Sequence, residues 1–350
     1  MRAVRWHARR DIRLEELPDP PAPGPGEIGV RVAWCGLCGS DVHEYRSGPF
    51  QIPLRPHPVT GRKAPIVLGH EVSGWVERIG PTVAGPAVAG PAVGELVSLN
   101  GLIPCHRCPQ CRRQAPQRCL SFGHIGMSAD GGLADRLTVP AEMVVAAPPG
   151  TDPELAALAE PFAVATHAIA QADRPADQRC LVLGAGTIGL ATALVLREAG
   201  NTVTVLDIVP ERIAHASALG LAAATDARAA PAAVVFECSG ASEAPATAIR
   251  LAEPGGLVVF VGLPEKPSML DVKPLVLREV RTIGAVSHRT RADLVPALGF
   301  LAAHPDSARR LITARIPLEA TVPNGIEVLA SPAARVHGKI LVRVAGQTLS

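Results

Sequence analysis

The sequence predicts an α/β protein of two domains, in which an irregular β-barrel is followed by a doubly wound parallel sheet. Up to about residue 150, Pro and Gly interrupt short β-rich runs, of which 28–34 and 71–79 alternate like half-buried strands. From about residue 151, apolar strands alternate with helical segments, a pattern typical of a parallel sheet covered by helices. At 350 residues the chain is long enough to give each domain a core of its own.

The second half contains the units from which a doubly wound sheet is built. Each apolar run of four or five residues is followed by a turn and then by a helical pattern. The repeated segment 85–93 in the first half is interpreted as a tolerated loop insertion. Strands are expected at 180–183, 203–207, 234–238, 257–261, 281–284 and 339–344, the last returning to the first domain, and helices at 188–199 and 210–219.

Composition and charge exclude several classes of function. Apolar residues make up 47% and charged residues 19% of the chain, and the formal net charge is +2. Neither a nucleic-acid partner nor a membrane is therefore expected. Residues 1–11 are charged throughout and lack the apolar core of a signal peptide, so the cytoplasm is the expected location. There, the eight cysteines are expected to be thiolate ligands or core thiols rather than disulfides.

A first group of candidate metal ligands lies in the predicted barrel. Cys35 and Cys38 have the Cys-x2-Cys spacing, and His70 and Glu71 follow about thirty residues later. A catalytic zinc takes three protein ligands from Cys, His and carboxylate side chains and keeps its fourth position open. Two thiolates, a histidine and a carboxylate together would fill that position, so one of the two cysteines is expected not to bind the metal.

A second group consists of four cysteines at close spacing. Four thiolates in one short segment suit a closed, tetrahedral structural zinc site that has no position left for chemistry. The alternative is a pair of disulfides, which a cytosolic chain disfavours. Arginines at 107, 112, 113 and 118 share this segment and are interpreted as a solvated face or a subunit contact. The four cysteines are Cys105, Cys108, Cys111 and Cys119.

The glycine-rich turn of the second half predicts a dinucleotide site. Gly184, Gly186 and Gly189 follow a strand and open a helix, and Asp207 ends the next strand eighteen residues later. Such glycines allow a tight turn and close approach of the backbone to a pyrophosphate at the helix N-terminus. Asp207 is expected to accept a hydrogen bond from the ribose 2′-hydroxyl and to repel a 2′-phosphate, which predicts NAD. Arg212 leaves contact with either the ribose or a phosphate open.

These motifs occur together and in order, and the whole chain resembles the zinc-dependent medium-chain dehydrogenase/reductase superfamily. Within it, the chain is most similar to (R,R)-butanediol dehydrogenases, which are relatives of sorbitol dehydrogenases. The resemblance implies a GroES-like catalytic domain over 1–150, a Rossmann NAD-binding domain over 151–290 and a C-terminal segment, 291–350, that returns to the catalytic domain. The closer markers are Arg5-Trp6-His7, the segment 34–45, Pro56-His57-Pro58, Ala159-Glu160-Pro161, the segment 312–318 and Lys339-Ile340-Leu341-Val342.

The resemblance also assigns roles to single residues. It implies that Cys38, His70 and Glu160 bind the catalytic zinc, with Glu71 as a neighbouring group that can enter the coordination sphere. Ser40 and His43 match the positions of the family's proton relay. A salt bridge is the alternative partner for the Glu160 carboxylate, which apolar residues flank. The implied coenzyme-binding residues are Gly184, Gly186, Ile188, Gly189, Asp207, Arg212, Val261 and Gly262.

The expected activity is reversible oxidation of a secondary alcohol by NAD with the help of zinc. Vicinal diols and hydroxyketones such as 2,3-butanediol and acetoin are the expected substrates, and a homodimer or homotetramer is the expected assembly. Ser287-His288 stands where sorbitol dehydrogenases carry an Arg-Tyr pair, which disfavours a polyol. The alternatives are a polyol, cyclitol or biosynthetic-intermediate dehydrogenase, and a zinc- and nucleotide-binding protein that has lost catalysis.

Overall fold

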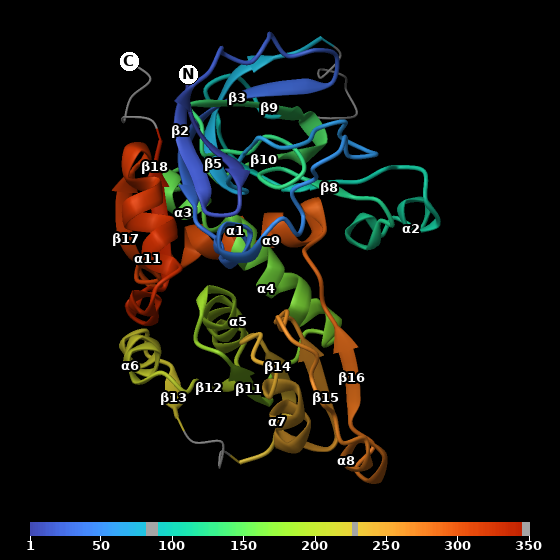
Figure 1. Cartoon of the computed structure of the whole chain (residues 1–350). Coiled ribbons are helices and arrows are strands. Elements are labelled where there is room, and N and C mark those ends of the chain that lie inside the picture. Colours follow the sequence, from blue (N-terminus) through green and yellow to red (C-terminus); the bar gives the residue numbers. More distant parts are fainter. Residues whose placement is uncertain (82–89, 226–229, 345–350) are drawn as a thin grey trace. The chain divides into compact units, whose positions relative to one another are not determined.

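The computed structural model describes residues 1–81, 90–225 and 230–344, and it divides into two compact units (Figure 1). Unit 1 comprises Met1–Glu160 and Arg289–Ser350, and unit 2 comprises Pro161–His288. The division falls within helix α4 (Ala159–Gln171). The domain boundaries at residues 150 and 290 stay predictions from the sequence. Most of the repeated segment 85–93 lies outside the described residues.

The main sheet of unit 1 is built around the long strand β3 (Glu27–Gly36). β3 pairs antiparallel with β5 (Glu71–Ile79), with β9 (Arg136–Pro140) and with β18 (Lys339–Arg343). By the last pairing, the C-terminal strand β18 lies beside β3 in unit 1. The remaining strands of this unit are β1 (Arg2–Ala8), β2 (Asp11–Glu16), β4 (Ile66–Val67), β6 (Leu96–Leu99), β7 (Leu102–Ile103), β8 (Gly123–His124), β10 (Val144–Ala146) and β17 (Ile312–Pro317).

Short helices and turns connect these strands, as the Pro- and Gly-punctuated sequence predicts. The longest helix that lies wholly in unit 1, α9 (Thr290–Ala303), has no counterpart in the sequence prediction, because Pro296 interrupts its pattern. The other α-helices are α1 (Gly39–Ser47), α2 (Pro109–Arg112), α3 (Pro153–Ala156), α10 (Pro305–Arg309) and α11 (Glu327–Leu329). Single turns of other helix types are η1 (Pro116–Arg118), η2 (Ala141–Met143), η3 (Leu318–Ala320), η4 (Thr321–Ile326) and η5 (Pro332–Val336).

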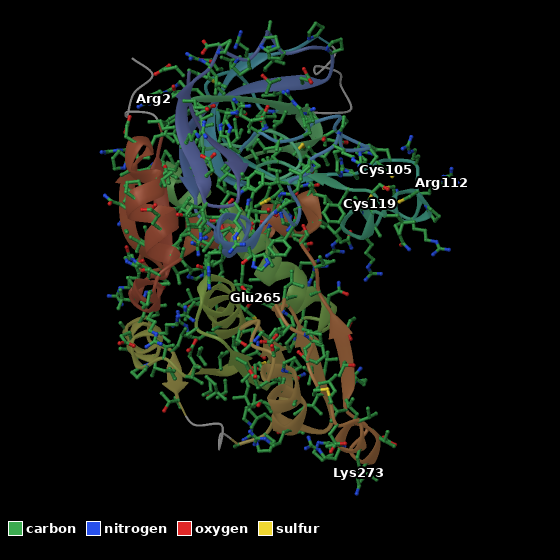
Figure 2. All side chains as sticks on the ribbon, in the orientation of Figure 1. Arg2, Cys105, Arg112, Cys119, Glu265 and Lys273 are labelled. Atoms are coloured by element: carbon green, nitrogen blue, oxygen red, sulfur yellow. The ribbon has the colours of Figure 1, made fainter. Side chains whose placement is uncertain are left out.

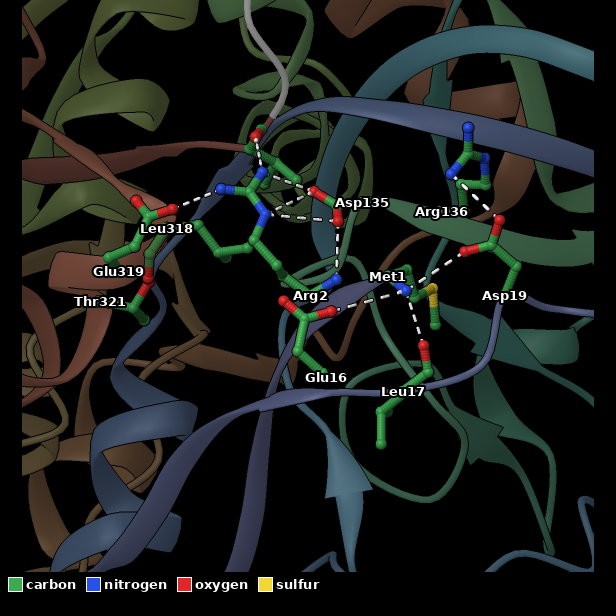
Figure 3. Close-up of polar contacts among 11 residues, drawn as sticks. Met1, Arg2, Glu16, Leu17, Asp19, Asp135, Arg136, Leu318, Glu319 and Thr321 are labelled. Atoms are coloured by element: carbon green, nitrogen blue, oxygen red, sulfur yellow. Dashed lines mark hydrogen bonds and ion pairs between the residues drawn. The ribbon is translucent and has the colours of Figure 1, made fainter.

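Ion pairs fasten the N-terminal strand to the rest of unit 1 (Figure 3). The Arg2 guanidinium donates to the Asp135 carboxylate at 2.6 Å and also pairs with Glu319. The amino group of Met1 lies 3.3 Å from the Asp19 carboxylate. Arg2 therefore links β1 to the segment before β9 and to the C-terminal part of the chain. Each of these pairs is partly exposed, so we expect each to contribute little stability by itself.

Unit 2 contains a six-stranded sheet in which every pairing is parallel, in the order β13-β12-β11-β14-β15-β16. This order confirms the doubly wound sheet. The strand order reverses between β11 and β14, which is where such sheets bind ligands at the carboxyl ends of their strands. The strands are β11 (Arg179–Leu183), β12 (Thr202–Leu206), β13 (Ala222–Ala224), β14 (Ala232–Glu237), β15 (Ala252–Phe260) and β16 (Arg281–Gly284), and the helices are α5 (Thr187–Glu198), α6 (Pro210–Ala218), α7 (Ala244–Leu251) and α8 (Lys273–Leu277).

The central strands of unit 2 are buried on both faces, which explains their continuous apolar sequence. Leu181, Val235 and Val258 lie on three neighbouring strands and are at most 1% exposed. Among the described residues, no helix is both long and apolar enough to cross a membrane.

Candidate functional site

The sheet of unit 1 brings two of the predicted zinc ligands, Cys38 and His70, together with Glu71. Cys38 caps α1 directly after β3, and His70 immediately precedes β5, which begins at Glu71. β3 and β5 are neighbours, with Gly36 paired to Glu71. A Cβ on residue 36 would lie 1.9 Å from the Glu71 carboxylate, so only glycine fits there. Strand pairing alone thus places side chains from residues 38, 70 and 71 at one end of the sheet.

These three side chains form a compact group of metal-ligating atoms. One ligand atom each of Cys38, His70 and Glu71 lies within 4.8 Å of the other two. His70 is 4% exposed, and its Nδ1 has no hydrogen-bond partner in the described part of the chain. This nitrogen lies 3.9 Å from a buried Asp41 oxygen, and a carboxylate beside one ring nitrogen orients the other, Nε2, for binding a metal.

Electrostatics also favour a cation at this place. Burial acts to lower the pKa of His70, but the Cys38 thiolate and the Asp41 carboxylate outweigh it and raise the pKa to about 10. An environment that holds a proton so strongly on a buried imidazole is one that favours positive charge in general. A thiolate, a carboxylate and a neutral imidazole are the donor set of a catalytic zinc, so the residues fit that ion.

Glu160 lies in the first turn of α4 and is 7% exposed. Its carboxylate is not part of the 4.8 Å group among the described residues, yet its charge acts on His70 and raises the pKa of that ring. Burial raises the pKa of Glu160 itself to about 7. Glu160 thus lies near the Cys38–His70–Glu71 group, but the carboxylate oxygens of Glu71 are closer to Cys38 and His70 than those of Glu160 are.

Two residues at this site were not found from the sequence. Lys339 begins β18 and is 3% exposed, and its Nζ donates to both Glu71 oxygens at 2.5 and 2.7 Å and to the Leu37 carbonyl at 2.8 Å. Asp41 is fully buried, accepts from the Cys38 N–H at 2.9 Å and has one oxygen 3.9 Å from His70 Nδ1. Burial raises the pKa of Asp41. A Ser-Asp pair after the cysteine was the one available signal for Asp41, whereas nothing in the sequence marks Lys339 as buried.

Cys35 lies apart from the candidate metal site. It is fully buried in the core of unit 1, and a Cβ on Gly69 would lie 2.5 Å from its sulfur. Burial raises the pKa of this thiol well above its ordinary value. Such a thiol packs as a small apolar group rather than as a thiolate ligand.

The two candidate relay residues lie on α1, on the chain that follows Cys38. Ser40 and His43 are both half-buried. The His43 ring stacks on Phe50, with centroids 4.0 Å apart and planes inclined by 32°. The buried Glu44 carboxylate accepts from the Phe50 N–H at 3.0 Å, which fixes the backbone that carries this ring.

The four-cysteine segment forms a second metal-ligating group, in which all four sulfur atoms lie within 4.8 Å of one another. Figure 2 shows Cys105 and Cys119 close together, with Arg112 farther out on the same lobe. All four cysteines are free, so no disulfide joins them. The Cys111 N–H lowers the pKa of Cys108 to about 6. Backbone donors that stabilise thiolates fit a closed Cys₄ zinc site.

In unit 2 the glycine turn has the geometry of a phosphate-binding loop. Gly184 has φ +98°, and Gly186 caps α5, in whose first turn Ile188 lies. A Cβ on Gly189 would lie 1.9 Å from the Gly184 carbonyl oxygen, so glycine is required where the helix meets the turn. Gly184 is therefore favoured by its backbone conformation and Gly189 by the lack of space for a side chain, while Gly186 leaves the N-terminus of α5 open to a phosphate.

Asp207 and Arg212 line a cavity of about 340 Å³ at the carboxyl ends of the strands. The Asp207 oxygens accept from the Ala185 N–H at 2.7 Å and the Val209 N–H at 2.9 Å, and Arg212 lies 3.8 Å from one of them. Asp207 therefore also holds the glycine turn, a second role that the sequence does not reveal. Val261 and Gly262 follow β15 and are half-buried, and both of their N–H groups donate to the Glu237 carbonyl.

Comparison with known proteins agrees with this picture. The family model of the alcohol dehydrogenase GroES-like domain matches residues 24–149, and that of the zinc-binding dehydrogenases matches residues 187–303. The (R,R)-butanediol dehydrogenase of Bacillus subtilis (strain 168) is 32% identical over an alignment of 359 positions, gaps included, that covers 98% of this chain and 99% of that protein. The sorbitol dehydrogenase of Arabidopsis thaliana is 29% identical over 84% of this chain and 82% of its own length.

Two crystal structures extend the likeness to three dimensions. The 2R,3R-butanediol dehydrogenase from Bacillus subtilis matches with a TM-score of 0.88 at 30% identity, over 98% of this chain and 99% of its own. A protein from Sinorhizobium meliloti 1021, described as a zinc-binding dehydrogenase and bound to NADP, matches with a TM-score of 0.83 at 28% identity, over 98% of each chain. These likenesses confirm the fold class that the sequence predicts.

Proposed function

This chain belongs to the zinc-binding alcohol dehydrogenase family, and from that premise we propose that it oxidises vicinal diols such as 2,3-butanediol to hydroxyketones such as acetoin, reversibly. Like its relatives it is an oxidoreductase that acts on CH–OH donors, with zinc and NAD as cofactors. The carrying observation is the Cys38, His70 and Glu71 group, whose ligand atoms lie within 4.8 Å in a chain that also has a dinucleotide loop.

We propose Cys38, His70 and Glu160 as the protein ligands of the catalytic zinc. Glu71 has the closer oxygens, but both of them already accept from Lys339, which offsets the negative charge of this carboxylate. Lys339 therefore holds Glu71 back and leaves Glu160 as the third ligand. Zinc held there supplies a Lewis acid that lowers the pKa of the substrate hydroxyl. His70 must lose its second proton before it can bind the metal, so we expect metal binding to release protons.

Ser40 and His43 are proposed to move the proton of the substrate hydroxyl. Oxidation removes that proton and transfers a hydride from the carbinol carbon to the nicotinamide, so the proton needs a path to solvent. Ser40 Oγ would accept it and pass it to the imidazole of His43, which is half-buried and so reachable from solvent. The Phe50 stack would keep this imidazole in place.

The other metal and coenzyme sites follow the same reasoning. Cys105, Cys108, Cys111 and Cys119 are proposed to hold a structural zinc that stabilises their lobe. Gly184, Gly186, Ile188 and Gly189 are proposed to hold the pyrophosphate, with Asp207 and Arg212 at the adenosine ribose and Val261 and Gly262 beside the nicotinamide. We also propose a cytoplasmic location, because all eight cysteines are free; recovery of the protein from an oxidising compartment would contradict it.

A substrate panel tests the proposed function. Diols, polyols and hydroxyketones are assayed by NADH absorbance, and zinc is measured on the same sample. We expect turnover of vicinal diols and hydroxyketones and about two zinc ions per chain, one for each site type. Turnover confined to polyols or cyclitols would favour the alternative dehydrogenases. Binding of zinc and NADH without turnover of any substrate would favour a protein that has lost catalysis.

Coenzyme choice is expected to depend on the charge of Asp207. Unmodified protein should have a higher kcat/KM with NAD than with NADP. Asp207→Asn should lower the ratio of these two kcat/KM values about tenfold, which corresponds to the loss of about 1.4 kcal/mol of repulsion between Asp207 and the 2′-phosphate of NADP. The same change frees Arg212, which now lies 3.8 Å from Asp207, to contact a 2′-phosphate. Asp207→Asn with Arg212→Ala is therefore the matched control and should regain part of the preference. Equal use of NAD and NADP by unmodified protein would contradict the assignment.

A second copy of this chain is the proposed partner of unit 2. Within the described chain, β16 pairs only with β15, which leaves an open sheet edge. Val276 and Leu277, on helix α8 directly before β16 in the chain, are 69% and 71% exposed. A two-fold pairing of β16 strands would cover this edge and these side chains in a homodimer, with a homotetramer as the larger option. A monomer in sedimentation at micromolar concentration would contradict this proposal.

A further inference from the structure

Glu237 is a buried carboxylate of unit 2 that the proposed reaction does not use. It ends β14 and is 1% exposed. Its Oε1 accepts from the Ser239 N–H at 2.7 Å, the Ser239 hydroxyl at 2.6 Å and the Gly240 N–H at 3.1 Å. Three donors directed at one oxygen suit a carboxylate that carries its negative charge. No basic side chain in the described parts of the chain forms an ion pair with it.

The second oxygen of Glu237 is the unusual feature. Oε2 is buried and has no hydrogen-bond partner among the described residues. It faces Gly262, because a Cβ on that glycine would lie 2.6 Å from it. An oxygen without a donor in a buried place is costly, so a reason for keeping a carboxylate here is needed.

Glu237 lies where three loops at the carboxyl edge of the sheet meet. A Cβ on Gly184, in the phosphate-binding turn, would lie 2.7 Å from Ser239 Cα, and one on Gly262 would lie 2.4 Å from Gly240 N. Ser239 also lines the cavity that contains Asp207. By its hydrogen bonds, Glu237 therefore fixes the turn that forms one wall of the coenzyme cavity.

The strand order indicates which half of the coenzyme faces Glu237. In doubly wound sheets the dinucleotide crosses the crevice where the strand order reverses, with its pyrophosphate at the helix after the first strand. Here Asp207 follows β12, on one side of β11, and marks the adenosine half. β14 and β15 lie on the other side of β11, so the nicotinamide half of a coenzyme bound in this crevice would extend toward Glu237 and Gly262.

We propose that Glu237 is a positioning residue that favours the oxidised coenzyme, because its buried charge attracts the cationic nicotinamide of NAD⁺ and not the neutral ring of NADH. This inference rests on the proposed coenzyme. It adds that the relative affinity of this chain for NAD⁺ and NADH depends on a residue that belongs neither to the glycine turn nor to the zinc site. Gly262 is required because any larger residue would contact Oε2.

The test compares equilibrium binding of the two coenzyme forms to the zinc-loaded full-length protein. The affinity for NADH is measured from the fluorescence of NADH, and the affinity for NAD⁺ is measured by calorimetry. Glu237→Gln keeps the side-chain size and the Oε1 acceptor but removes the charge. We expect the Kd of NAD⁺ to rise about five- to tenfold and the Kd of NADH to change less than about twofold. Equal changes in both Kd values would overturn the inference, since they would mean that Glu237 only shapes the turn.

Ser239→Ala is the control that keeps the charge in place and disturbs only the turn, because it removes one donor to Oε1. In this variant the Kd values of NAD⁺ and NADH should change by the same factor to within about twofold. Should Glu237→Gln fail to fold, Glu237→Asp replaces it, because it withdraws the charge by one methylene: the Kd of NAD⁺ should then rise more than that of NADH, and equal changes would overturn the inference. If unmodified protein binds neither coenzyme, the proposed function fails. If it binds both, and Glu237→Gln leaves the ratio of the NAD⁺ and NADH Kd values unchanged, only this inference fails.

Discussion

Cys38→Ala should abolish alcohol oxidation and remove one zinc ion per chain, while the protein still binds NADH. Cys38 contributes the thiolate of the proposed three-ligand site, and its sulfur lies within 4.8 Å of the ligand atoms of His70 and Glu71. Loss of that charge leaves a histidine and carboxylates, of which Glu71 is already held by Lys339. We expect turnover to fall by at least about a thousandfold, because a metal centre supplies several kcal/mol of charge stabilisation.

Cys35→Ala is the matched control, since the two cysteines are separated by only two residues. Cys35 is fully buried among apolar side chains, so its loss should cost about 1 to 2 kcal/mol of stability and leave zinc content and most activity intact. Metal analysis, NADH fluorescence and steady-state rates on both variants make the comparison. NADH binding is the internal check, because the coenzyme residues lie in unit 2 and Cys38 lies in unit 1. Exchanged phenotypes, or loss of zinc in both variants, would contradict the ligand assignment.

Local patterns predicted much of the fold. β11, β14 and the second half of β15 are apolar runs that are largely buried, and such runs are visible in the sequence close to their places in the structure. The helix α9 was missed, because Pro296 in its interior and the absence of a one-sided apolar stripe hide its period. Its existence depends on packing within unit 1, which a local pattern does not contain.

The same distinction applies to the site. Cys38, His70 and the four-cysteine lobe were found because their side-chain types are rare and chemically specific. Lys339 and Glu71 are 268 positions apart, and they meet only because β18 and β5 both pair with the same end of β3. Glu237 likewise depends on its place in the sheet, since the sequence does not show that one of its oxygens lacks a donor.

Lys339→Met should destabilise unit 1 strongly, by about 3 to 5 kcal/mol. The ammonium group is 3% exposed and is bound by both Glu71 oxygens and by the Leu37 carbonyl. Its removal leaves the Glu71 carboxylate, 1% exposed, without its cation. Burial acts to lower the pKa of Lys339, but the negative groups around it, Glu71 foremost and Cys38 next, together outweigh burial and raise the pKa above 10.5. The pair's contribution is therefore fully present below that value and is lost only as the pH rises through the folded-state pKa, so it is intact at neutral pH.

Urea denaturation followed by tryptophan fluorescence measures this effect in the relevant unit, because Trp6, Trp34 and Trp75 are the only tryptophans and all lie in unit 1. The control is Lys339→Met with Glu71→Leu, which removes both charges and should recover much of the loss, since replacing a whole buried pair by apolar groups is often neutral. Zinc content separates two consequences of the single change. If Lys339 holds Glu71 away from the metal, Lys339→Met should retain zinc and bind it at least as tightly, because the released carboxylate becomes an additional ligand. Weaker zinc binding in folded Lys339→Met would mean that Lys339 positions the site rather than restrains Glu71.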